Sequence, residues 1–507
     1  EVTSMKYNLN SFIACFCIAS TPSLGFIAQS PARAFRNSKV SSTSIGEVIV
    51  KQRIEPREWF ESIRKQATVP EPFLELAKNG SMVLSDADLP NRKQEPYRYT
   101  NLQTFYQKKF KLMKDKNINE ELASQYFSSK GNGQRLVFVN GKFNSDLSDL
   151  SSVPANVFAG SGLDENVGEE NKKILFEILG NIDEVNISKN TCQGSLPFAA
   201  LNQASLEDFA AIIVPNDTTV ENEIQVLFIS HYFGHETDKS GGISHPRLAV
   251  FAGENSKFTL VQHFAGFGEY FTNSLARFSL SNKANLTFFN VQEESPESYH
   301  INTIQTELKQ NCTYSGVLLG SGGHNARTNF QIEFVDTDSN CELKAVALAS
   351  DKQFMDFRTQ LGLASPDNTC DQQHRNIVAE RAECVFKGRI RVDGSAQKTD
   401  AKQLCKSLML SDKARVTVMP TLEITADDVS CRHGATVSDL DEEALFYMGC
   451  RGIGERDAKT LFIKGFAVDL IEALSDEKVK GRLEDKLRRM TPTGPRSVPS
   501  EGAFSSI

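Results

Sequence analysis

The sequence lacks the features typical of membrane proteins and of proteins that bind nucleic acids broadly. Beyond its first thirty positions, the 507-residue chain has no run of eighteen apolar residues, which is about what a helix needs to span a bilayer. Lys and Arg number 56 against 64 Asp and Glu, whereas contact with phosphate backbones requires clustered cations. We therefore expect no membrane span and no nucleic-acid partner, and we favour proteins or small molecules as partners.

Several catalytic motifs are also missing. The chain has no G-x-x-x-x-G-K-[ST] loop for a triphosphate, no H-E-x-x-H for zinc and no G-x-S-x-G nucleophile turn. Residues 320–327, GSGGHNAR, are rich in glycine but contain no lysine. We interpret them as a tight corner between strands, so any nucleotide hydrolysis must come from another subunit.

Cysteines are present but form no framework. The ten cysteines include no C-x-x-C pair and no regular spacing, which fits free thiols in a reducing compartment better than a disulfide scaffold. Cys15 and Cys17 lie in the N-terminal stretch discussed next. We expect Cys312 and Cys341 to line the core, because free cysteine is among the most often buried residue types.

The N-terminus is typical of a targeting signal in two parts. An apolar stretch over residues 9–20 is followed by small residues just before Phe26, as at a signal-peptide cleavage site. Residues 26–46 contain no acidic side chain, but three basic ones and several serines, as in a transit peptide. The pair resembles the targeting of plastids enclosed by extra membranes, so the stroma of a complex plastid is the predicted location. An ordinary secretory signal is the alternative.

The chain divides into regions that differ in composition and in the periodicity of their apolar residues. We predict a targeting segment over 1–46, a mostly helical region over 47–215, a β-rich core over 216–436, a C-terminal helical domain over 437–490 and a disordered tail over 491–507. Within the second region, RLVFVNGKF predicts a strand, and both NKKILFEILGN and SLPFAALNQASLEDFAAIIV have helical patterns.

The β-rich core contains an internal repeat. Six segments begin with a polar turn and continue with alternating apolar residues: 255–264, 281–291, 310–321, 339–350, 380–392 and 412–424. Equivalent positions in them are separated by 26, 28, 29, 41 and 32 residues. Because one such unit cannot bury its apolar face alone, stacking of the units predicts a β-solenoid, with a loop in the 41-residue step at GLASPDNTCDQQH. A β-sandwich or barrel is the alternative.

Apolar residues also form a stripe in the C-terminal helical domain. They are Leu461, Phe462, Phe466, Leu470, Ile471 and Leu474. The stripe either packs on the strands of the same chain or fills the groove of a partner.

The pair Cys431 and His433, in ADDVSCRHGAT, is a candidate metal site. On an extended segment, residues i and i+2 project to the same side, so the thiolate and the imidazole could reach one metal ion. Four ligands are usual for a tetrahedral iron or a cluster, and no second Cys/His pair lies nearby in the sequence. The remaining ligands must come from elsewhere, or the pair is simply part of a strand end.

Longer motifs resemble those of the SufB/SufD family, and of SufD proteins in particular, which are scaffold subunits of the SUF machinery for iron–sulfur cluster assembly. They are AQKTDA, LEI.ADDV.C.HGAT and DEEALFY followed by RGI, with LPNRKQEPYRYTNL, LPFAALNQA and HPRLAVFAGENSKFTLVQHF upstream. The resemblance covers most of the chain after the targeting segment. It implies a non-catalytic subunit with a right-handed parallel β-helix between helical regions.

The same resemblance implies partners and a site. The β-helix pairs with that of a SufB-like paralogue, the C-terminal helices dock a SufC-like ABC ATPase, and iron or a nascent cluster is handled at the interface of the two β-helices. A reduced flavin is associated with the whole complex. In this sequence the interface residues are His433 and Cys431. Cys405 lies where SufB-like chains carry a cysteine used in cluster building, so it is either a core thiol or a sign of retained chemistry.

Two alternatives remain open. A polysaccharide lyase or hydrolase on the same architecture would need a basic residue and several carboxylates gathered on one face. A metal-free docking solenoid would need neither Cys431 nor His433.

Overall fold

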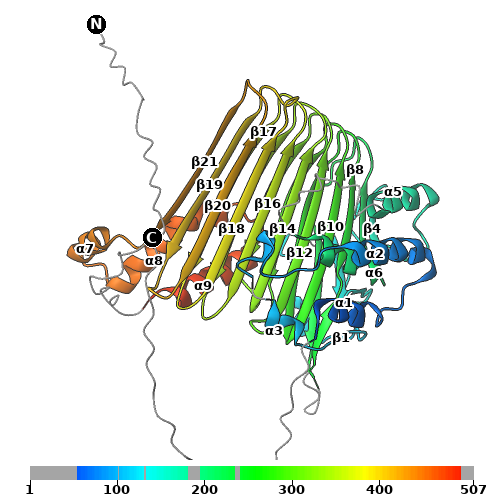
Figure 1. Cartoon of the computed structure of the whole chain (residues 1–507), viewed down its shortest axis with the longest axis horizontal. Helices are drawn as coiled ribbons and strands as arrows, with labels where there is room; N and C mark the ends of the chain where they lie inside the picture. The colour runs from blue at the N-terminus through cyan, green and yellow to red at the C-terminus, as the bar shows by residue number, and fades with distance from the viewer. Residues whose placement is uncertain (1–53, 101, 131–132, 181–193, 235–239, 493–507) are drawn as a thin grey trace, which may run out of the picture. The chain divides into compact units, whose positions relative to one another are not determined.

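The chain coils through two facing sheets. The computed structural model describes residues 54–492, except for residue 101 and the segments 131–132, 181–193 and 235–239. From β9 onward successive strands alternate between the sheets, and from β10 onward each pairs in parallel with the strand two places earlier (Figure 1). The prediction of a mainly β, parallel solenoid with helices on both sides in the sequence is confirmed. The predicted targeting segment 1–46 and residues 493–507 of the predicted tail lie outside the described residues.

We call the two sheets A and B. The strands of sheet A are β4 (Phe158–Ser161), β5 (Ala210–Val214), β8 (Arg247–Ala252), β10 (Tyr270–Leu280), β12 (Tyr299–Leu308), β14 (Asn325–Phe334), β16 (Phe354–Leu363), β18 (Glu383–Val392) and β20 (Arg415–Ile424), with the short strands β1 (Phe110–Leu112) and β7 (Gly241–Ser244) beside them. The strands of sheet B are β3 (Lys142–Phe143), β2 (Arg135–Val139), β6 (Ile224–Tyr232), β9 (Lys257–Gly268), β11 (Asn285–Glu293), β13 (Thr313–Gly320), β15 (Asn340–Ala349), β17 (Thr369–Val378), β19 (Asp400–Met409) and β21 (Ser430–Ser438).

The turns that lead into sheet B share one backbone feature. Each sheet B strand from β9 to β19 begins two residues after a residue with positive φ, and these residues are Asn255, Lys283, Asn311, Asp338, Asp367 and Lys398. Asn and Asp adopt this left-handed conformation more readily than other non-glycine residues. The recurring conformation redirects the chain from one sheet to the other at each turn. GSGGHNAR likewise forms a corner, between β13 and β14, as predicted.

The predicted repeat alignment is wrong in its register. Its first four segments are strands of sheet B, but its last two are β18 and β20 of sheet A. The 41-residue step therefore skips β16 and β17, and GLASPDNTCDQQH is not a long loop but the end of one strand, a short turn and the start of the next. In sheet B the true register joins Phe258, Leu286, Tyr314, Cys341, Cys370, Ala401 and Cys431. Both sheets alternate with period two, so the pattern alone cannot tell them apart.

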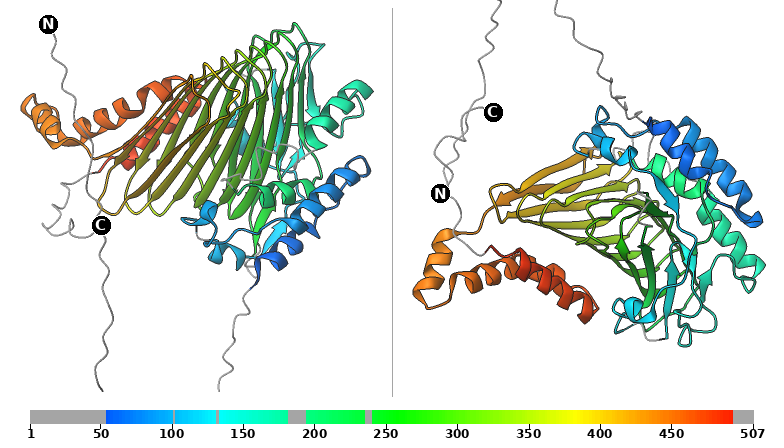
Figure 2. Two further views of the ribbon diagram at one scale, coloured as in Figure 1. Left: turned by 45° about the horizontal axis from the view of Figure 1, so that its top comes forward. Right: turned by 90° about the horizontal axis from the view of Figure 1, so that it is seen from below.

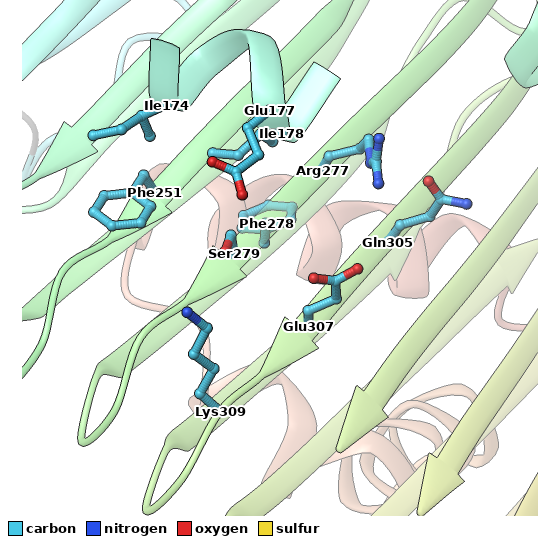
Figure 3. Close-up of a pocket in the computed structure, with 10 residues that line it drawn as sticks. All are labelled: Ile174, Glu177, Ile178, Phe251, Arg277, Phe278, Ser279, Gln305, Glu307 and Lys309. Atoms are coloured by element: carbon cyan, nitrogen blue, oxygen red, sulfur yellow. The ribbon is translucent and has the colours of Figure 1, made fainter. Parts of the chain in front are cut away.

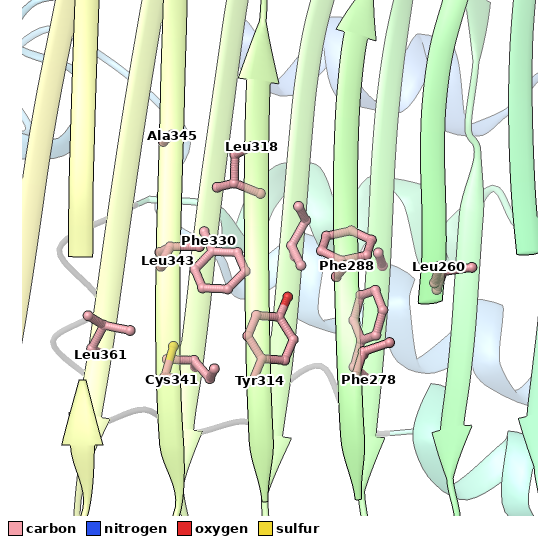
Figure 4. Packing of buried hydrophobic residues seen from close by; sticks show 14 of the residues in the cluster. Leu260, Phe278, Phe288, Tyr314, Leu318, Phe330, Cys341, Leu343, Ala345 and Leu361 are labelled. Carbon is pink, nitrogen blue, oxygen red and sulfur yellow. The ribbon is translucent and has the colours of Figure 1, made fainter. Parts of the chain in front are cut away.

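The core fills the space between the sheets. Inward side chains of both sheets, such as Phe288 in sheet B and Phe330 in sheet A, form one buried cluster (Figure 4). Cys312 and Cys341 belong to it, as predicted, with exposed fractions of 1% and 0%. Burial of each large apolar side chain contributes about 1.5–3 kcal/mol, so the stacked turns stabilise one another.

Helices from the N-terminal part cover the outer face of sheet A. They are α1 (Pro56–Arg64), the 3₁₀ turns η1 (Glu71–Phe73) and η2 (Glu95–Tyr97), α2 (Leu74–Asp86), α3 (Gln103–Tyr106), α5 (Glu169–Gly180) and α6 (Leu196–Ala204). The short helix α4 (Glu120–Ser124) instead packs on sheet B, where Ala123 contacts side chains of β2, β6 and β9. Trp59 of α1 packs in a cluster with Phe198 of α6 and Phe271 of β10. The prediction of helix throughout SLPFAALNQASLEDFAAIIV is wrong after residue 204, where a short connection over 205–209 leads into β5. Strands β2 to β5 already belong to the two sheets, although they precede residue 216.

Three helices follow the solenoid: α7 (Glu442–Cys450), α8 (Glu455–Glu472) and α9 (Glu477–Met490). The helices α8 and α9 lie on the outer face of sheet B (Figure 2), where Leu470, Ile471 and Leu474 are buried against its strands. This supports packing on the same chain for most of the apolar stripe, whereas Leu461 is 53% exposed.

None of the helices in the described part of the chain is long and apolar enough to cross a membrane.

Candidate functional site

The candidate metal ligands lie on the last strand of the solenoid. Strand β21 pairs in parallel with β19, and β20 pairs with β18. On their other sides β20 and β21 pair with no strand among the residues that the structure describes. In Figure 1 these two strands stand at the end of the row opposite to the N-terminal helices. The last turn therefore presents two free strand edges and the open end of the core.

The register shows which way Cys431 and His433 point. Cys431 pairs with Ala401, and His433 pairs with Gln403. Ala401 and Gln403 are buried on the inner face of β19. Because alternate residues of a strand point to the same side, Cys431 and His433 also belong to the inner face, as the sequence predicted for one shared side. Cys431 is half-buried and His433 is exposed, since no further turn covers them.

The turn before β21 is held by Asp428. Its backbone N–H donates to Gln397 Oε1 at 2.9 Å, and its carbonyl oxygen accepts from the Lys398 N–H at 2.7 Å. The carboxylate of Asp428 also pairs with the Lys398 ammonium group. These bonds tie the start of β21 to the preceding turn and thereby fix the register of Cys431 and His433.

The thiols of Cys431 and Cys405 have different surroundings. Burial raises the pKa of Cys431, and the backbone hydrogen bond at Ala401 opposes this effect. Cys405 is fully buried on the inner face of β19, and burial raises the pKa of its thiol to about 12. Its sulfur lies 3.7 Å from Asn376 Nδ2. Cys405 is thus an enclosed, protonated core thiol in this structure, whereas Cys431 is the thiol at the open end.

Thiol and imidazole groups suit iron, which both ligand types bind in proteins. Within the described ranges, no group of three or more His, Cys, Asp or Glu side chains is arranged to hold a metal ion. Cys431 and His433 alone would supply two ligands, and metal binding at Cys431 would require release of the thiol proton.

The open end includes apolar residues that the sequence analysis did not single out as functional. Val416, Val418 and Leu422 of β20 are only partly buried, although they pack against the core cluster. They are the sheet A counterparts of Cys431 and His433 at the uncovered end. The alternation in RVTVMPTLEI did signal a strand, but nothing in it showed that no further turn follows.

A second exposed surface lies on α7. None of the nine residues of this helix is buried, and Phe446 and Tyr447 are 74% and 58% exposed. The helix begins at Asp441, whose carboxylate accepts from the backbone N–H groups of Glu443 and Ala444. In Figure 1, α7 extends beyond the last strands.

A pocket of about 310 Å³ lies between α5 and the outer face of sheet A. Figure 3 shows its polar side chains: Glu177 from the helix, and Arg277, Gln305, Glu307 and Lys309 from the strands and the adjoining turn. Here carboxylates and cations gather on one face, which is the arrangement that the enzyme alternative requires.

Comparison with known proteins gives consistent results. The family model described as SUF system FeS cluster assembly, SufBD core domain, matches residues 235–466, and the model described as SufBD protein N-terminal region matches residues 66–226. An iron–sulfur cluster assembly SufBD family protein of Synechocystis is 28% identical over 411 residues, covering 79% of this chain and 87% of the relative.

Two further relatives extend this result. A protein of Arabidopsis thaliana named ABCI7, chloroplastic, is 28% identical over 423 residues, covering 82% of this chain and 86% of the relative. The iron–sulfur cluster assembly protein SufD of Escherichia coli is 26% identical over 413 residues, covering 80% of this chain and 90% of the relative. The similarity thus extends over most of both chains in each comparison.

Proposed function

Because the chain belongs to the SufBD family of the SUF system for iron–sulfur cluster assembly, we propose that it is a non-catalytic scaffold subunit whose open solenoid end pairs with a SufB-like partner. Iron or a nascent cluster is the cargo of that interface. The observation that carries the proposal is the uncovered last turn, in which a thiol and an imidazole share one inner face.

The free edges of β20 and β21 support the pairing. Unpaired strand edges offer backbone N–H and C=O groups to another chain, and the partly buried apolar side chains beside them lose water contact when they are covered. A partner with the same architecture supplies both a matching edge and a matching core. It would also bring the ligands that Cys431 and His433 lack.

The C-terminal helices support a second contact, with a SufC-like ATPase. Phe446 and Tyr447 on α7 are exposed in this chain, and aromatic residues are enriched at protein interfaces. Reduced flavin, which the resemblance associates with the whole complex, is assigned to no residue of this chain. A plastid location is part of the proposal and draws on the name of the Arabidopsis relative.

The test is anaerobic copurification of the full chain with its natural partners, followed by iron and sulfide analysis. We expect a SufB-like protein and an ATPase to copurify. His433→Ala should lower the iron and sulfide content at least several-fold while the complex still forms. His324→Ala is the matched control, because His324 is also exposed but lies in the turn before β14. Normal cluster yield from His433→Ala would remove the site assignment.

Two alternatives make different predictions. The metal-free docking solenoid predicts that His433→Ala and Cys431→Ser are both silent, with partner binding intact. The lyase or hydrolase alternative draws on the charged pocket in Figure 3. It predicts cleavage of an acidic polysaccharide that Glu307→Gln abolishes, and the absence of cleavage by the wild-type chain would exclude it.

A further inference from the structure

The inner face of sheet B changes character along one column of residues. At equivalent register positions, successive strands place Leu260, Phe288, Gly316, Leu343, Gln372, Gln403 and His433. The first four positions cannot form side-chain hydrogen bonds, and the last three can. Polar side chains therefore appear in this column only as it approaches the open end, and His433 is its last member.

The two glutamines are joined in series. Gln372 Nε2 donates to Thr359 Oγ1 of the facing sheet at 2.7 Å, and Gln403 Nε2 donates to Gln372 Oε1 at 2.8 Å. Both glutamine side chains are buried. These bonds connect Gln403 on β19 to Gln372 on β17, and Gln372 to Thr359 on β16. The amide nitrogen of Gln403 is therefore directed back toward the interior of the solenoid.

The amide oxygen of Gln403 has no partner. Gln403 is only 2% exposed, and its Oε1 atom is buried without a hydrogen bond in the described structure. Gly388 on the opposite sheet leaves the space that the amide fills, because a Cβ atom at Gly388 would lie 2.2 Å from Gln403 Nε2. The side chain is thus held in place while a buried acceptor remains unused, which proteins generally avoid.

The next residue in the column is His433. The same one-strand spacing separates Gln372 from Gln403, whose amides meet, and Gln403 from His433. A neutral imidazole has one N–H donor and one nitrogen with a free lone pair. A donor on the inner side of the His433 ring would satisfy the Gln403 acceptor, and the other ring nitrogen would then face the open end.

We propose that Gln403 is a positioning residue for His433: Gln403 Oε1 accepts the proton of one imidazole nitrogen and thereby directs the other nitrogen toward iron at the partner interface. The inference rests on the proposed function for the role of iron, but the proposed hydrogen bond between the two side chains does not depend on it. A hydrogen bond of this kind to a metal-bound histidine fixes the tautomer and the ring orientation.

The direct test uses the full chain labelled with nitrogen-15 in its histidines, and His433→Ala to identify the His433 signals. We expect the wild-type ring to hold a single tautomer, with one clearly protonated nitrogen and one clearly unprotonated nitrogen. Gln403→Met keeps the length of the side chain but removes the acceptor, so the two signals should move toward averaged values. Gln403→Glu restores an acceptor and should restore the single tautomer.

Gln262→Met is the matched control, because Gln262 is also a buried inner-face amide of sheet B, but lies in β9, far from the open end. Its exchange should leave the His433 signals unchanged. The proposal is overturned if the wild-type ring shows averaged tautomers, or if Gln403→Met leaves the tautomer unchanged. Should Gln403→Met fail to fold, a single tautomer in both the wild-type chain and Gln403→Glu supports the proposal, and averaged signals in either one overturn it.

A second measurement connects the contact to iron. In the complete complex, Gln403→Met should weaken iron binding about ten-fold or more, as changes of this kind do at metal sites, whereas Gln403→Glu should stay within a few-fold of wild type. If His433→Ala leaves iron content normal while Gln403→Met shifts the tautomer, the proposed function fails and the contact stands. If His433→Ala removes iron but the tautomer does not respond to Gln403→Met, the positioning role fails alone.

Discussion

The two ends of the solenoid are built differently. At the N-terminal end, β4 runs antiparallel to β5, β3 runs antiparallel to β2, and nearly every residue of β2 and β5 is buried. At the C-terminal end, β20 and β21 continue the parallel coil without reversal, and their residues are half-buried or exposed. The first end is therefore closed, and the second stops in the middle of its repeating pattern.

The difference shows how one end of a solenoid can remain available for binding to a partner. A reversed strand interrupts the parallel pattern that another coil of the same kind could extend. Where the coil simply stops, the edge and the inner side chains remain available. In this chain the available end is also the one that carries Cys431, His433 and the polar column behind them. Substitutions in the covered turns or at the closed end should therefore act differently from those at the open end.

The largest effect is expected in the covered turns. Phe330→Ala should lower the free energy of unfolding by about 3–5 kcal/mol, because Phe330 is fully buried and its loss leaves a cavity. Leu422→Ala should cost less, about 1 kcal/mol, because Leu422 is only partly buried on β20. Urea unfolding of the isolated chain measures both values. Equal losses would show that the last turn is packed as well as the middle turns.

Partner binding should depend on the open end, although substitutions there change the stability of the chain little. Val437 is 48% exposed and belongs to the inner face of β21. Val437→Asp should therefore leave the isolated chain stable but weaken association with the SufB-like partner about 100-fold, or about 2.7 kcal/mol, because it places a charge in a desolvated contact. Ser145→Asp, beside β3 at the closed end, should change nothing. Binding titrations with the purified partner test this, and equal affinities of both variants would contradict it.

The outer face of sheet A offers a pH test. Burial raises the pKa of Glu333 to about 7, and the neighbouring Asp393 and Glu307 carboxylates add to the shift while Arg391 opposes it. A folded-state pKa above the unfolded value means that stability is lost as pH rises from about 4.5 to 7. Glu333→Gln should therefore stabilise the chain by about 3 kcal/mol at pH 8 and have little effect near pH 4.

Thermal or urea unfolding at the two pH values measures this difference, with the exposed Glu297→Gln as control. An equal effect of Glu333→Gln at both pH values would show that the carboxyl does not titrate in this range. Since Glu333 lies on β14, well inside the covered turns, partner binding should not change.

The smallest effect is expected at α7, beyond the open end. Asp441→Ala removes the two hydrogen bonds that start the helix and should destabilise it locally by about 1 kcal/mol. Global unfolding should hardly change, because no residue of α7 is buried. Hydrogen exchange of the α7 amides measures the local loss, and unchanged exchange would contradict the capping role.

The sequence predicted some of these features well and others poorly. Alternating apolar residues and small repeating units favoured a β-solenoid over a sandwich or barrel, because both properties are local, and the family resemblance added that its strands are parallel. The register of the repeat could not be predicted, since the strands of sheets A and B have the same alternating pattern. The motif around Cys431 and His433 was visible in the sequence. The inner column that contains Gln403 and His433 was not visible in the sequence, because it depends on pairing between strands thirty residues apart.

The polar residue Gln403 shows why part of the site could not be found in advance. In the sequence it is one glutamine in a strand, with nothing to separate it from a solvent-facing residue. Only the pairing with Gln372 and the space beside Gly388 show that its amide is enclosed and aligned. A similar limit applies to the exposed end, because the sequence of β20 and β21 resembles that of the covered strands before them.

Site-specific photo-crosslinking within the complete complex tests most directly whether the open end is the paired end. A photoreactive residue would replace Thr436 on β21 in one variant and Ser145 beside β3 in another. We predict a crosslink to the SufB-like partner from position 436 and none from position 145. A crosslink to that partner from position 145, with none from position 436, would contradict the claim that the open end of this solenoid is completed by a second one.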